Sequence, residues 1–510
     1  MSREQTFTYD VLVIGGGQAA LAAAIAAKEE GASVAVLTKG KAGLGGSSVI
    51  SDGVHSAIFS PGDSLDLFYQ DIIKGSRQVA DRYLARILAE ECTDRVNELE
   101  SKFGIELERE RQVSTPGHSF PRRVYAGKGI GRNITKTIGS YAREIGIDIH
   151  EQSILVDLIK ENERITGAVV LRDKDIYVYY SSAIILATGG FGGLYSSTDN
   201  PRDITGEGIG MAWRHGVRLV DMEFVQFYPY RLKSPANVDI MTRIFGKGAI
   251  LLNEEQVRFM DQFPRKELET RDILSYSMFK QGKVLLDFSN VKEKDIQTDS
   301  PHLYRLFKKG HEGDWIMSPV QHYCMGGIET DEWGRTNLQG LYACGECSGG
   351  LHGANRLGGG SLTEALVFGH RAGKMAASEM WESQKNKKRL VDEFFVSESK
   401  RTMEQEVIQK MKEIMWAKVG IERTIQSLQE AVDELESIAL ELEEEQNVLN
   451  LPIQDKIRTA WASALAGMTR KESRGAHKIL DIPEEKKEWE KKIIIYKSSI
   501  IFLENSSQRQ

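Results

Sequence analysis

A continuous apolar run followed at once by closely spaced glycines lies near the start of this 510-residue chain and limits what it can fold into. Residues 11–14 are all apolar, which is typical of a strand buried in a parallel sheet. Gly15-x-Gly17-x-x-Ala20 follows, and the sequence predicts an alanine-rich helix over residues 19–28 and a second strand over residues 33–37. These segments form a βαβ unit, so we expect an α/β fold built on a doubly wound sheet.

The rest of the chain divides by composition. A further buried strand at 183–187 runs into Thr188-Gly189-Gly190, and predicted helices such as 84–103 alternate with strands. Residues 225–320 lose this rhythm and are richer in aromatics, prolines and turns, which predicts an inserted α+β capping domain. A last strand is expected at 493–496. Before it, apolar residues recur three and four apart as in a helical bundle: Ile421, Ile425, Leu428, Val432, Leu435, Ile438 and Leu442, then Ile457, Trp461 and Leu465.

Composition argues against several classes of protein. A net charge of −7 without a basic stripe argues against a protein that binds nucleic acid. Four cysteines in 510 residues fit a reducing compartment, so we expect a cytoplasmic protein without structural disulfides. Cys344-x-x-Cys347 lacks a second cysteine pair, and no metal site is predicted. No window has the ~18 to 20 apolar residues of a membrane span, so we expect a membrane link only through a partner.

The glycines after the first strand predict a dinucleotide site, because they let a pyrophosphate approach the backbone at a helix N-terminus. The acidic residue that would bind the adenosine ribose after the second strand is absent, and Thr38-Lys39 stands there instead. Another strand, residues 341–344, ends in Gly345-Glu346, whose carboxylate can accept hydrogen bonds from ribityl hydroxyls. The pattern favours FAD over NAD, with a helix that begins at Ser361-Leu362 directing its positive end toward the flavin.

Taken in order, these segments make roughly residues 8–480 resemble the flavoprotein superfamily of succinate dehydrogenase, fumarate reductase and L-aspartate oxidase. The most specific run is His352-Gly353-Ala354-Asn355-Arg356-Leu357. The resemblance implies an FAD-binding domain in two parts (1–224 and 321–382), a capping domain (225–320) and a C-terminal helical domain (383–510). Further motifs in family order are Phe224-Val225-Gln226-Phe227, Thr270-Arg271-Asp272, His322-Tyr323-x-x-Gly326-Gly327 and Glu472-Ser473-Arg474-Gly475-Ala476-His477.

The resemblance also implies a reaction, hydride exchange between flavin N5 and a substrate carbon with proton transfer at the adjacent carbon. By match with the family motifs, Arg271 is the expected proton donor or acceptor, and His322 and Arg356 are expected to bind a substrate carboxylate. A guanidinium binds a carboxylate through two parallel hydrogen bonds, so these arginines suit an acid substrate. Further substrate contacts are expected from Tyr228, Thr242, Arg243 and His118.

The expected cofactor site draws on all the glycine-rich segments. Its predicted residues are Gly15, Gly17, Gln18, Ala19, Ala20, Thr38, Lys39, Gly46, Ser47, Ser48, Gly53, Thr188, Gly189, Gly190, Asp221, Gly345, Glu346, Arg356, Gly360, Ser361 and Leu362. Ser47 stands where some family members carry the histidine that bonds covalently to the flavin. Since serine cannot form that bond, we expect non-covalent FAD.

Three other departures concern the substrate. Tyr228 replaces a histidine of the family that binds carboxylate, and Arg243 replaces a glutamate of the family's proton relay. An arginine cannot accept a proton there and is expected to add positive charge near Arg271. L-aspartate oxidase carries an acid before its Gly-His-Ser to bind the substrate amine, and none precedes Gly117-His118-Ser119.

We therefore predict an FAD-dependent oxidoreductase of the succinate dehydrogenase and fumarate reductase type that acts on a small carboxylic acid. It would serve as the flavoprotein subunit of a larger electron-transfer complex, whose iron–sulfur clusters a second subunit would carry. Two alternatives stay open: a stand-alone enzyme of the L-aspartate oxidase kind, and a flavin electron-relay subunit whose substrate site has decayed. The sequence leaves the substrate, the direction and the electron acceptor open.

Overall fold

The βαβ unit at the start of the chain forms the centre of the molecule. The computed structural model describes residues 5–110, 116–173, 175–311, 313–379, 401–443, 450–497 and 499–504. In it β1 (Gln5–Ile14), α1 (Gln18–Glu29) and β2 (Val34–Leu37) follow one another, and the two strands pair in parallel. Val11 and Val13 face the core on the α1 side of the sheet, whereas Leu12 and Ile14 face the core on the opposite side. Burial of both faces explains why the run is apolar throughout.

Five more strands complete a seven-stranded sheet. Its order is β6 (Asp148–His150), β2, β1, β9 (Asp175–Leu186), β8 (Arg164–Arg172) and β7 (Ile154–Glu161), and β17 (Leu341–Ala343) pairs with the carboxyl end of β9. β6, β2, β1, β9 and β17 run parallel, whereas β8 pairs antiparallel with both of its neighbours, β9 and β7. In a sheet of this kind a ligand binds beyond the carboxyl ends of the parallel strands. The α/β fold class expected from the sequence is confirmed.

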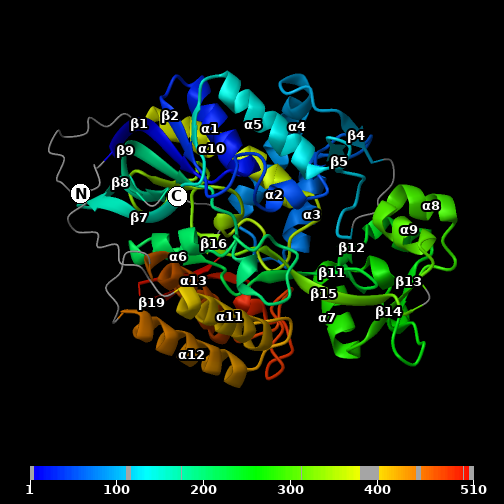
Figure 1. Cartoon of the computed structure of the whole chain (residues 1–510). Coiled ribbons are helices and arrows are strands. Elements are labelled where there is room, and N and C mark those ends of the chain that lie inside the picture. The colour runs from blue at the N-terminus through cyan, green and yellow to red at the C-terminus, as the bar shows by residue number, and fades with distance from the viewer. Residues whose placement is uncertain are drawn as a thin grey trace.

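Helices cover both faces of this sheet (Figure 1). On one face α1 packs against α10 (Gly360–Ser378), with α3 (Leu65–Gly75), α4 (Arg82–Ser101) and α5 (Gly131–Glu144) beside them. A Cβ at Gly369 would lie only 2.8 Å from the carbonyl oxygen of Ala19, so glycine lets these two helices approach closely. On the other face lie α6 (Glu207–Arg214) and α13 (Leu451–Thr469). Nearer the cavity are α2 (Ser47–Ile50) and a small sheet of β3 (Val54–Ser56), β5 (Arg123–Ala126) and β4 (Leu107–Arg109).

Residues 225–324 form an outer lobe beside the central sheet, green in Figure 1. Its antiparallel sheet has the order β12 (Val238–Asp239), β11 (Val225–Ser234), β15 (Ile316–Cys324), β14 (Val284–Asp287) and β13 (Ile250–Leu252). α7 (Arg271–Gln281), α8 (Glu293–Asp299) and α9 (Pro301–Lys308) pack around it. The lobe has its own core, separate from the two cores of the central sheet, which fits an inserted unit.

The C-terminal part contains helices and a returning hairpin. α11 (Arg401–Lys418), α12 (Ile425–Glu443) and α13 pack together, and β18 (Lys491–Tyr496) and β19 (Ser499–Glu504) then join β10 (Leu219–Val220) and β16 (Gly327–Ile328) in a four-stranded sheet. The strand expected at 493–496 is therefore present but is not the last one.

One sequence prediction for this part differs from the structure, and another falls on residues that the structure does not describe. The sequence pattern places the start of the apolar repeat at Ile421, but α12 begins at Ile425, because Thr424 and Ser427 cap the helix by reciprocal hydrogen bonds of 2.9 Å. The predicted border between residues 382 and 383 lies outside the described residues.

Within the residues that the structure describes, no helix has both the length and the apolar character needed to cross a membrane.

Candidate active site

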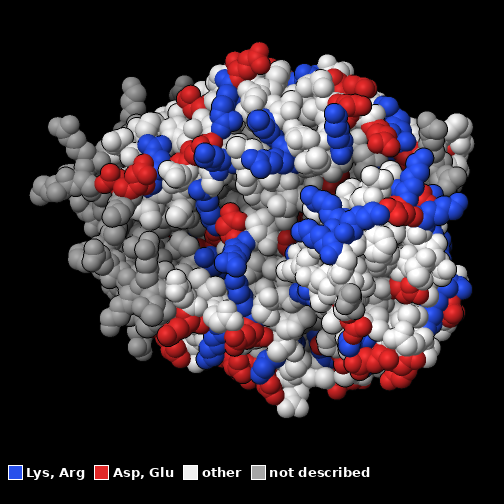
Figure 2. All heavy atoms as spheres, turned by 45° about the vertical axis from the view of Figure 1, so that its right-hand side comes forward, with Lys and Arg blue, Asp and Glu red and all other residues white. Residues whose placement is uncertain are grey.

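A long cavity runs from the carboxyl ends of the parallel strands to the outer lobe. It is lined by three glycine-rich turns and, at its far end, by polar side chains of the lobe. In the view of Figure 2 the molecular surface has a hollow at its centre, with Lys and Arg side chains on both sides and acidic side chains among them. Predicted residues in the lining are Gly15, Gly17, Gln18, Ala19, Thr38, Lys39, Gly46, Ser47, Ser48, Thr188, Gly189, Tyr228, Arg271, His322, Gly345, Glu346, Arg356, Ser361 and Leu362.

The N-terminus of α1 closes one side of the cavity. Gly15 has φ +134°, and a Cβ there would overlap the carbonyl oxygen of Ala187, so the turn itself requires glycine. At Gly17 a Cβ would meet only Ser48 Oγ, at 3.3 Å, and the remaining space belongs to the cavity. The N–H groups of the first helical turn, of which that of Gln18 donates to Ser48 Oγ at 3.3 Å, thus border the space where a dinucleotide phosphate would lie.

The adenosine end has an acidic residue that comes from elsewhere in the chain. Lys39, after β2, forms an ion pair with Glu207, in the first turn of α6, and donates a hydrogen bond of 3.3 Å to the carbonyl oxygen of Asp203. Burial lowers the pKa of Lys39 to about 8. Glu207 was not predicted, since it lies 168 residues after Lys39 and no motif links the two.

Glu346 occupies the middle of the cavity after β17. Its Oε1 accepts a hydrogen bond of 3.0 Å from the backbone N–H of Cys324, and burial raises its pKa to about 7. A Cβ at Gly190 would lie 2.5 Å from the same oxygen, so this glycine makes room for the carboxyl group. Gly190 therefore supports the site from behind, without lining the cavity.

The start of α10 faces the same space. Gly359 has φ +84° and precedes the helix, and Gln18 Nε2 donates a hydrogen bond of 3.2 Å to the carbonyl oxygen of Leu362. The N-termini of α1 and α10 thus both border the cavity, together with the Glu346 carboxyl group. Two positive helix ends, glycine turns and a buried acceptor fit the phosphates and hydroxyls of FAD.

Four further residues predicted for the cofactor do not line the cavity: Ala20, Gly53, Asp221 and Gly360. Ala20 is fully buried within α1. Asp221 is also fully buried, with φ +57°, and its pKa is raised by burial and by nearby Glu223. It lies beneath the site, where the backbone of Gly326 passes too closely for any side chain.

Arg271 and Arg356 reach the far end of the cavity from opposite elements. Arg271, the first residue of α7, donates a hydrogen bond of 2.9 Å to Gln226 Oε1 and lies 5.1 Å from the centre of the Tyr228 ring. Arg356 donates to Ser361 Oγ at 3.2 Å and lies 4.4 Å from the centre of the Tyr323 ring. Burial lowers the pKa of both guanidinium groups, that of Arg356 to about 10. Neither arginine has an ion-pair partner among the described residues, so both are available to an anionic ligand.

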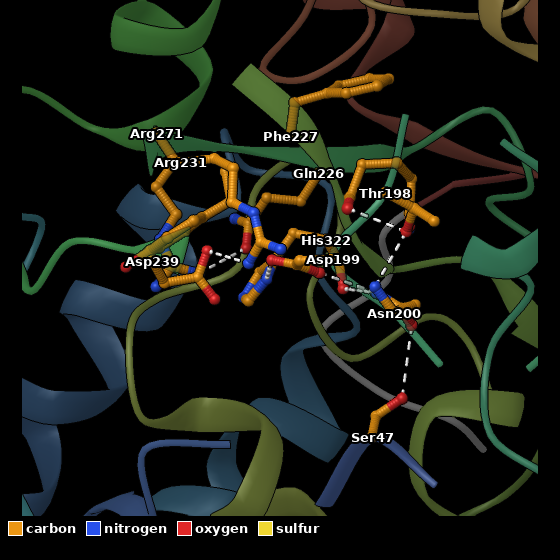
Figure 3. A network of polar contacts seen from close by, with 12 residues as sticks. Ser47, Thr198, Asp199, Asn200, Gln226, Phe227, Arg231, Asp239, Arg271 and His322 are labelled. Atoms are coloured by element: carbon orange, nitrogen blue, oxygen red, sulfur yellow. Dashed lines mark hydrogen bonds and ion pairs between the residues drawn. The ribbon is translucent and has the colours of Figure 1, made fainter. Parts of the chain in front are cut away.

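His322 completes this end of the cavity. Its Nδ1 lies 2.7 Å from Asp199 Oδ2 (Figure 3). Its ring stacks on that of Tyr228, with centroids 4.8 Å apart. Burial lowers the pKa of His322, while Asp199 acts in the opposite direction. The three predicted catalytic residues are therefore brought together from α7, β15 and the loop before α10.

The other predicted substrate contacts lie outside the cavity lining. Arg243 stacks 4.1 Å from the Tyr125 ring and lies 3.6 Å from Asp299, so its charge is partly compensated away from Arg271. His118 is buried against the carbonyl oxygen of Gly358, at 3.0 Å, and burial lowers its pKa to about 4. Thr242 is buried beside Arg243.

Several cavity residues were missed by sequence reasoning, namely Asp52, Arg123, Asp199, Asn200, Glu207 and Asp239. Asp52 lies between the predicted residues Ser48 and Gly53, which was the available signal. Glu207 lies in the glycine-rich segment Gly206-Glu207-Gly208-Ile209-Gly210, which was a second available signal. The remaining residues come from segments without a glycine motif, and their place depends on how loops cross the sheet edge. Four of the missed residues, Asp52, Asp199, Glu207 and Asp239, carry carboxyl groups. The charged residues predicted for the cavity were mostly cationic.

Two helix N-termini and glycine turns at one end of the cavity, and convergent arginine and histidine side chains at the other, are the arrangement of a flavin-dependent oxidoreductase. Residues 10–362 match the family described as FAD binding domain, and residues 408–504 match that described as fumarate reductase flavoprotein C-term. The chain belongs to the flavoprotein superfamily of succinate dehydrogenase, fumarate reductase and L-aspartate oxidase. The cofactor is FAD, and the enzyme is an FAD-dependent oxidoreductase, as predicted.

Individual relatives agree with this placement. The chain is 31% identical to a subunit of the fumarate reductase (CoM/CoB) of Methanothermobacter marburgensis, over 96% of this chain and 97% of that protein. It is 30% identical to L-aspartate oxidase of Synechocystis sp., over 98% of this chain and 99% of that protein. Among solved structures, a single-residue mutant of FrdA from E. coli quinol fumarate reductase has a TM-score of 0.88 and 26% identity, over 98% of this chain and 97% of that one.

Proposed function

We propose that this FAD-dependent oxidoreductase of the fumarate reductase and succinate dehydrogenase type exchanges a hydride and a proton, in total two electrons and two protons, with a small dicarboxylic acid. The observation that carries this proposal is the convergence of Arg271, Arg356 and His322 at the far end of the cavity. Arg356 and His322 are suited to bind substrate carboxylates, and Nε of Arg356 is buried without a hydrogen-bond partner among the described residues. The names of the relatives, fumarate reductase among them, support the same substrate class.

Bound FAD supplies hydride transfer at flavin N5, and the protein supplies binding, orientation and the proton. Arg356, held by Ser361, is assigned to grip one substrate carboxylate. Arg271, held by Gln226, is assigned to deliver the proton to the carbon next to the one that receives hydride. Tyr228 lies between Arg271 and His322 and keeps the guanidinium and the imidazole in place, because it contacts each of them.

FAD is proposed to be bound without a covalent bond. Ser47 lines the cavity at the place where some members of the superfamily carry the linking histidine, and its hydroxyl donates a hydrogen bond of 3.3 Å to Asn200 Oδ1. The affinity would then come from helix N-termini, glycine turns and the Glu346 carboxyl group.

A partner protein and a cytoplasmic location are part of the same proposal. Two relatives, one a subunit of fumarate reductase (CoM/CoB) and the other FrdA of a quinol fumarate reductase, support a place in a multi-subunit complex. An iron–sulfur protein is the kind of partner that would carry electrons to or from the flavin. The four cysteines are buried free thiols, which supports a reducing compartment.

Oxidation of an amino acid is the second candidate, because two carboxyl groups, Asp52 and Asp239, line the same cavity and would pair with a substrate amine. The relative named L-aspartate oxidase supports it.

One experiment separates these candidates. Photoreduced holoprotein is mixed anaerobically with fumarate, and oxidised holoprotein with succinate or L-aspartate, with and without oxygen, while the flavin absorbance is followed. Rapid flavin reoxidation by fumarate is expected; bleaching by L-aspartate instead would favour the second candidate. If no acid alters the flavin spectrum, the electron-relay alternative takes precedence.

A further inference from the structure

His322 is fixed from two sides, more firmly than a simple carboxylate-binding residue requires. Its Nδ1 lies 2.7 Å from Asp199 Oδ2, and its ring is stacked on Tyr228 at an interplanar angle of 26°. With Nδ1 bonded to a carboxylate, the neutral ring carries its proton on Nδ1 and presents the lone pair of Nε2. Figure 3 shows the ring and the carboxyl group of Asp199 facing one another, with Arg271 nearby.

Asp199 is itself held rigidly. Its second carboxylate oxygen accepts a hydrogen bond of 3.1 Å from Asn200 Nδ2, and its backbone N–H donates to the carbonyl oxygen of Gln321 at 3.1 Å. Asn200 Nδ2 also donates to the carbonyl oxygen of His322 at 2.7 Å, and Thr198 Oγ1 donates to Gln321 Oε1 at 2.7 Å. The segment 198–200 is thus bonded to the strand that carries His322, so carboxylate and imidazole form one preorganised unit.

The other ring nitrogen faces the cavity. Nε2 of His322 has no hydrogen-bond partner among the residues that the structure describes, and the ring is in the cavity lining. Arg271 and Arg356 both lie close enough to lower the pKa of the ring. An imidazole oriented by a buried carboxylate, with its free nitrogen in a substrate cavity, has the geometry of a general acid–base group.

Arg271 by itself has no route for exchanging a proton among the described residues. Its side chain donates a hydrogen bond to the amide of Gln226, which neither accepts nor releases a proton near neutral pH. Arg243 lies with Asp299 and Tyr125, outside the cavity lining. His322 is a group of near-neutral intrinsic pKa that contacts the same Tyr228 ring as Arg271.

We propose that His322, oriented by Asp199, is the group that passes the proton between Arg271 and solvent, in addition to any contact it makes with substrate. This inference rests on the proposed function. In the reductive direction the carbon–carbon π bond of the substrate breaks; one carbon gains the hydride that bound FAD supplies, and its neighbour gains a proton from Arg271. Solvent protonates Nε2 of the neutral ring, and the imidazolium that forms passes this proton to the neutral Arg271, which restores both side chains. Asp199 is a positioning residue, because it acts through His322.

Other charged groups lie near His322 and Asp199. Asp52 and Asp239 line the same cavity, Arg231 pairs with Asp239 at 2.8 Å, and burial raises the pKa of both carboxyl groups. Asp157 offers a matched control outside the cavity lining: its Oδ1 lies 2.7 Å from Nε2 of another histidine, His215.

The test compares Asp199→Asn with Asp157→Asn in FAD-loaded protein, with fumarate as substrate and reduced methyl viologen as electron donor. Asparagine keeps the size of the side chain but removes the charge. We expect Asp199→Asn to keep FAD content and KM within about threefold and to lose kcat by about 10²-fold, the scale of an acid–base group. The limb of the kcat–pH profile that reports His322 should shift or vanish. Asp157→Asn, which alters a histidine–carboxylate contact outside the cavity lining, should stay within about threefold of wild type with an unchanged profile, and thermal melting checks that it is folded.

A second readout does not depend on turnover. Oxidised holoprotein labelled with ¹⁵N-histidine, with His322 assigned through His322→Gln, should show the Nδ1–H form of the neutral ring in wild type. Asp199→Asn should raise the population of the Nε2–H form and lower the imidazole pKa, because the carboxylate that favours the charged ring is gone.

Two results would overturn the inference. One is an Asp199→Asn variant with wild-type kcat and pH profile; the other is a variant that raises KM alone, which would make His322 a carboxylate-binding residue only. Failure of the proposed function is distinguishable, because wild-type protein would then not turn over fumarate, whereas failure of the inference leaves wild-type turnover intact.

Discussion

Replacing Gly17 by valine tests the cofactor site with little disturbance of the fold. Gly17 precedes α1 with φ −84° and ψ −173°, which is extended backbone that valine adopts readily. A Cβ there would meet only Ser48 Oγ, at 3.3 Å, so the neighbour must move by a few tenths of an ångström. The two methyl groups beyond Cβ would enter the cavity where the pyrophosphate of FAD approaches the helix.

The expected loss of FAD affinity follows from steric crowding of the valine methyl groups in the cavity. Forcing extra methyl groups into a filled site costs about 1–3 kcal/mol, which corresponds to roughly 5- to 150-fold weaker FAD binding. The assay is calorimetric titration of cofactor-free protein with FAD, together with the flavin-to-protein absorbance ratio after purification. Gly246→Val is the matched control, because a Cβ at Gly246 has no atom within 4 Å and lies outside the cavity lining. Thermal melting of both variants shows whether the fold is kept.

The opposite result would be informative. A folded Gly17→Val protein with wild-type affinity for FAD would show that the dinucleotide does not pass this turn, and the assignment of the α1 N-terminus would be wrong. Gly15→Ala should behave differently: φ +134° and the carbonyl oxygen of Ala187 leave no room for a side chain, so loss of folded protein is expected there.

Three further outcomes are expected. Acid precipitation should leave the yellow FAD in the supernatant, because Ser47 cannot bond to it covalently; flavin fluorescence on the denatured protein band would contradict this. Arg271→Lys should keep the flavin spectral shift on fumarate binding but lower kcat by about 10²-fold. Arg356→Lys should weaken fumarate binding by about 1.5–3 kcal/mol, since a lysine cannot form the two parallel hydrogen bonds of a guanidinium. Titration and steady-state kinetics distinguish the two effects, and wild-type values for either variant would remove the role assigned to that arginine. Burial raises the pKa of Glu346 from 4.5 to about 7, so the folded, cofactor-free protein binds more protons than the unfolded chain in this window and its stability should fall as pH rises from 4.5 to 7. Melting temperatures of Glu346→Gln should fall less over this range, and equal slopes would contradict the prediction.

Much of the fold could be predicted from local sequence patterns. The apolar run at 11–14 can be buried only between two layers, and the glycines after it permit a turn that side chains would block, so a βαβ unit and a dinucleotide site followed directly. The family motifs located Arg271, His322 and Arg356, and the structure brings all three to one cavity. Their assigned roles stay predictions, as do the domain limits.

The tertiary structure alone decided how the charges are arranged. Asp199 and His322 are 123 residues apart and meet because a β-bridge joins Thr198 to Gln321. Lys39, after β2, pairs with Glu207 of α6, and Arg243 lies against Asp299 and the Tyr125 ring, outside the cavity lining. Periodicity and turn residues report local conformation and burial, whereas a hydrogen bond across the chain depends on where a loop crosses a sheet edge. The sequence therefore determined the kind of cofactor and the main cations, and the packing of loops over the sheet determined which carboxyl groups face them.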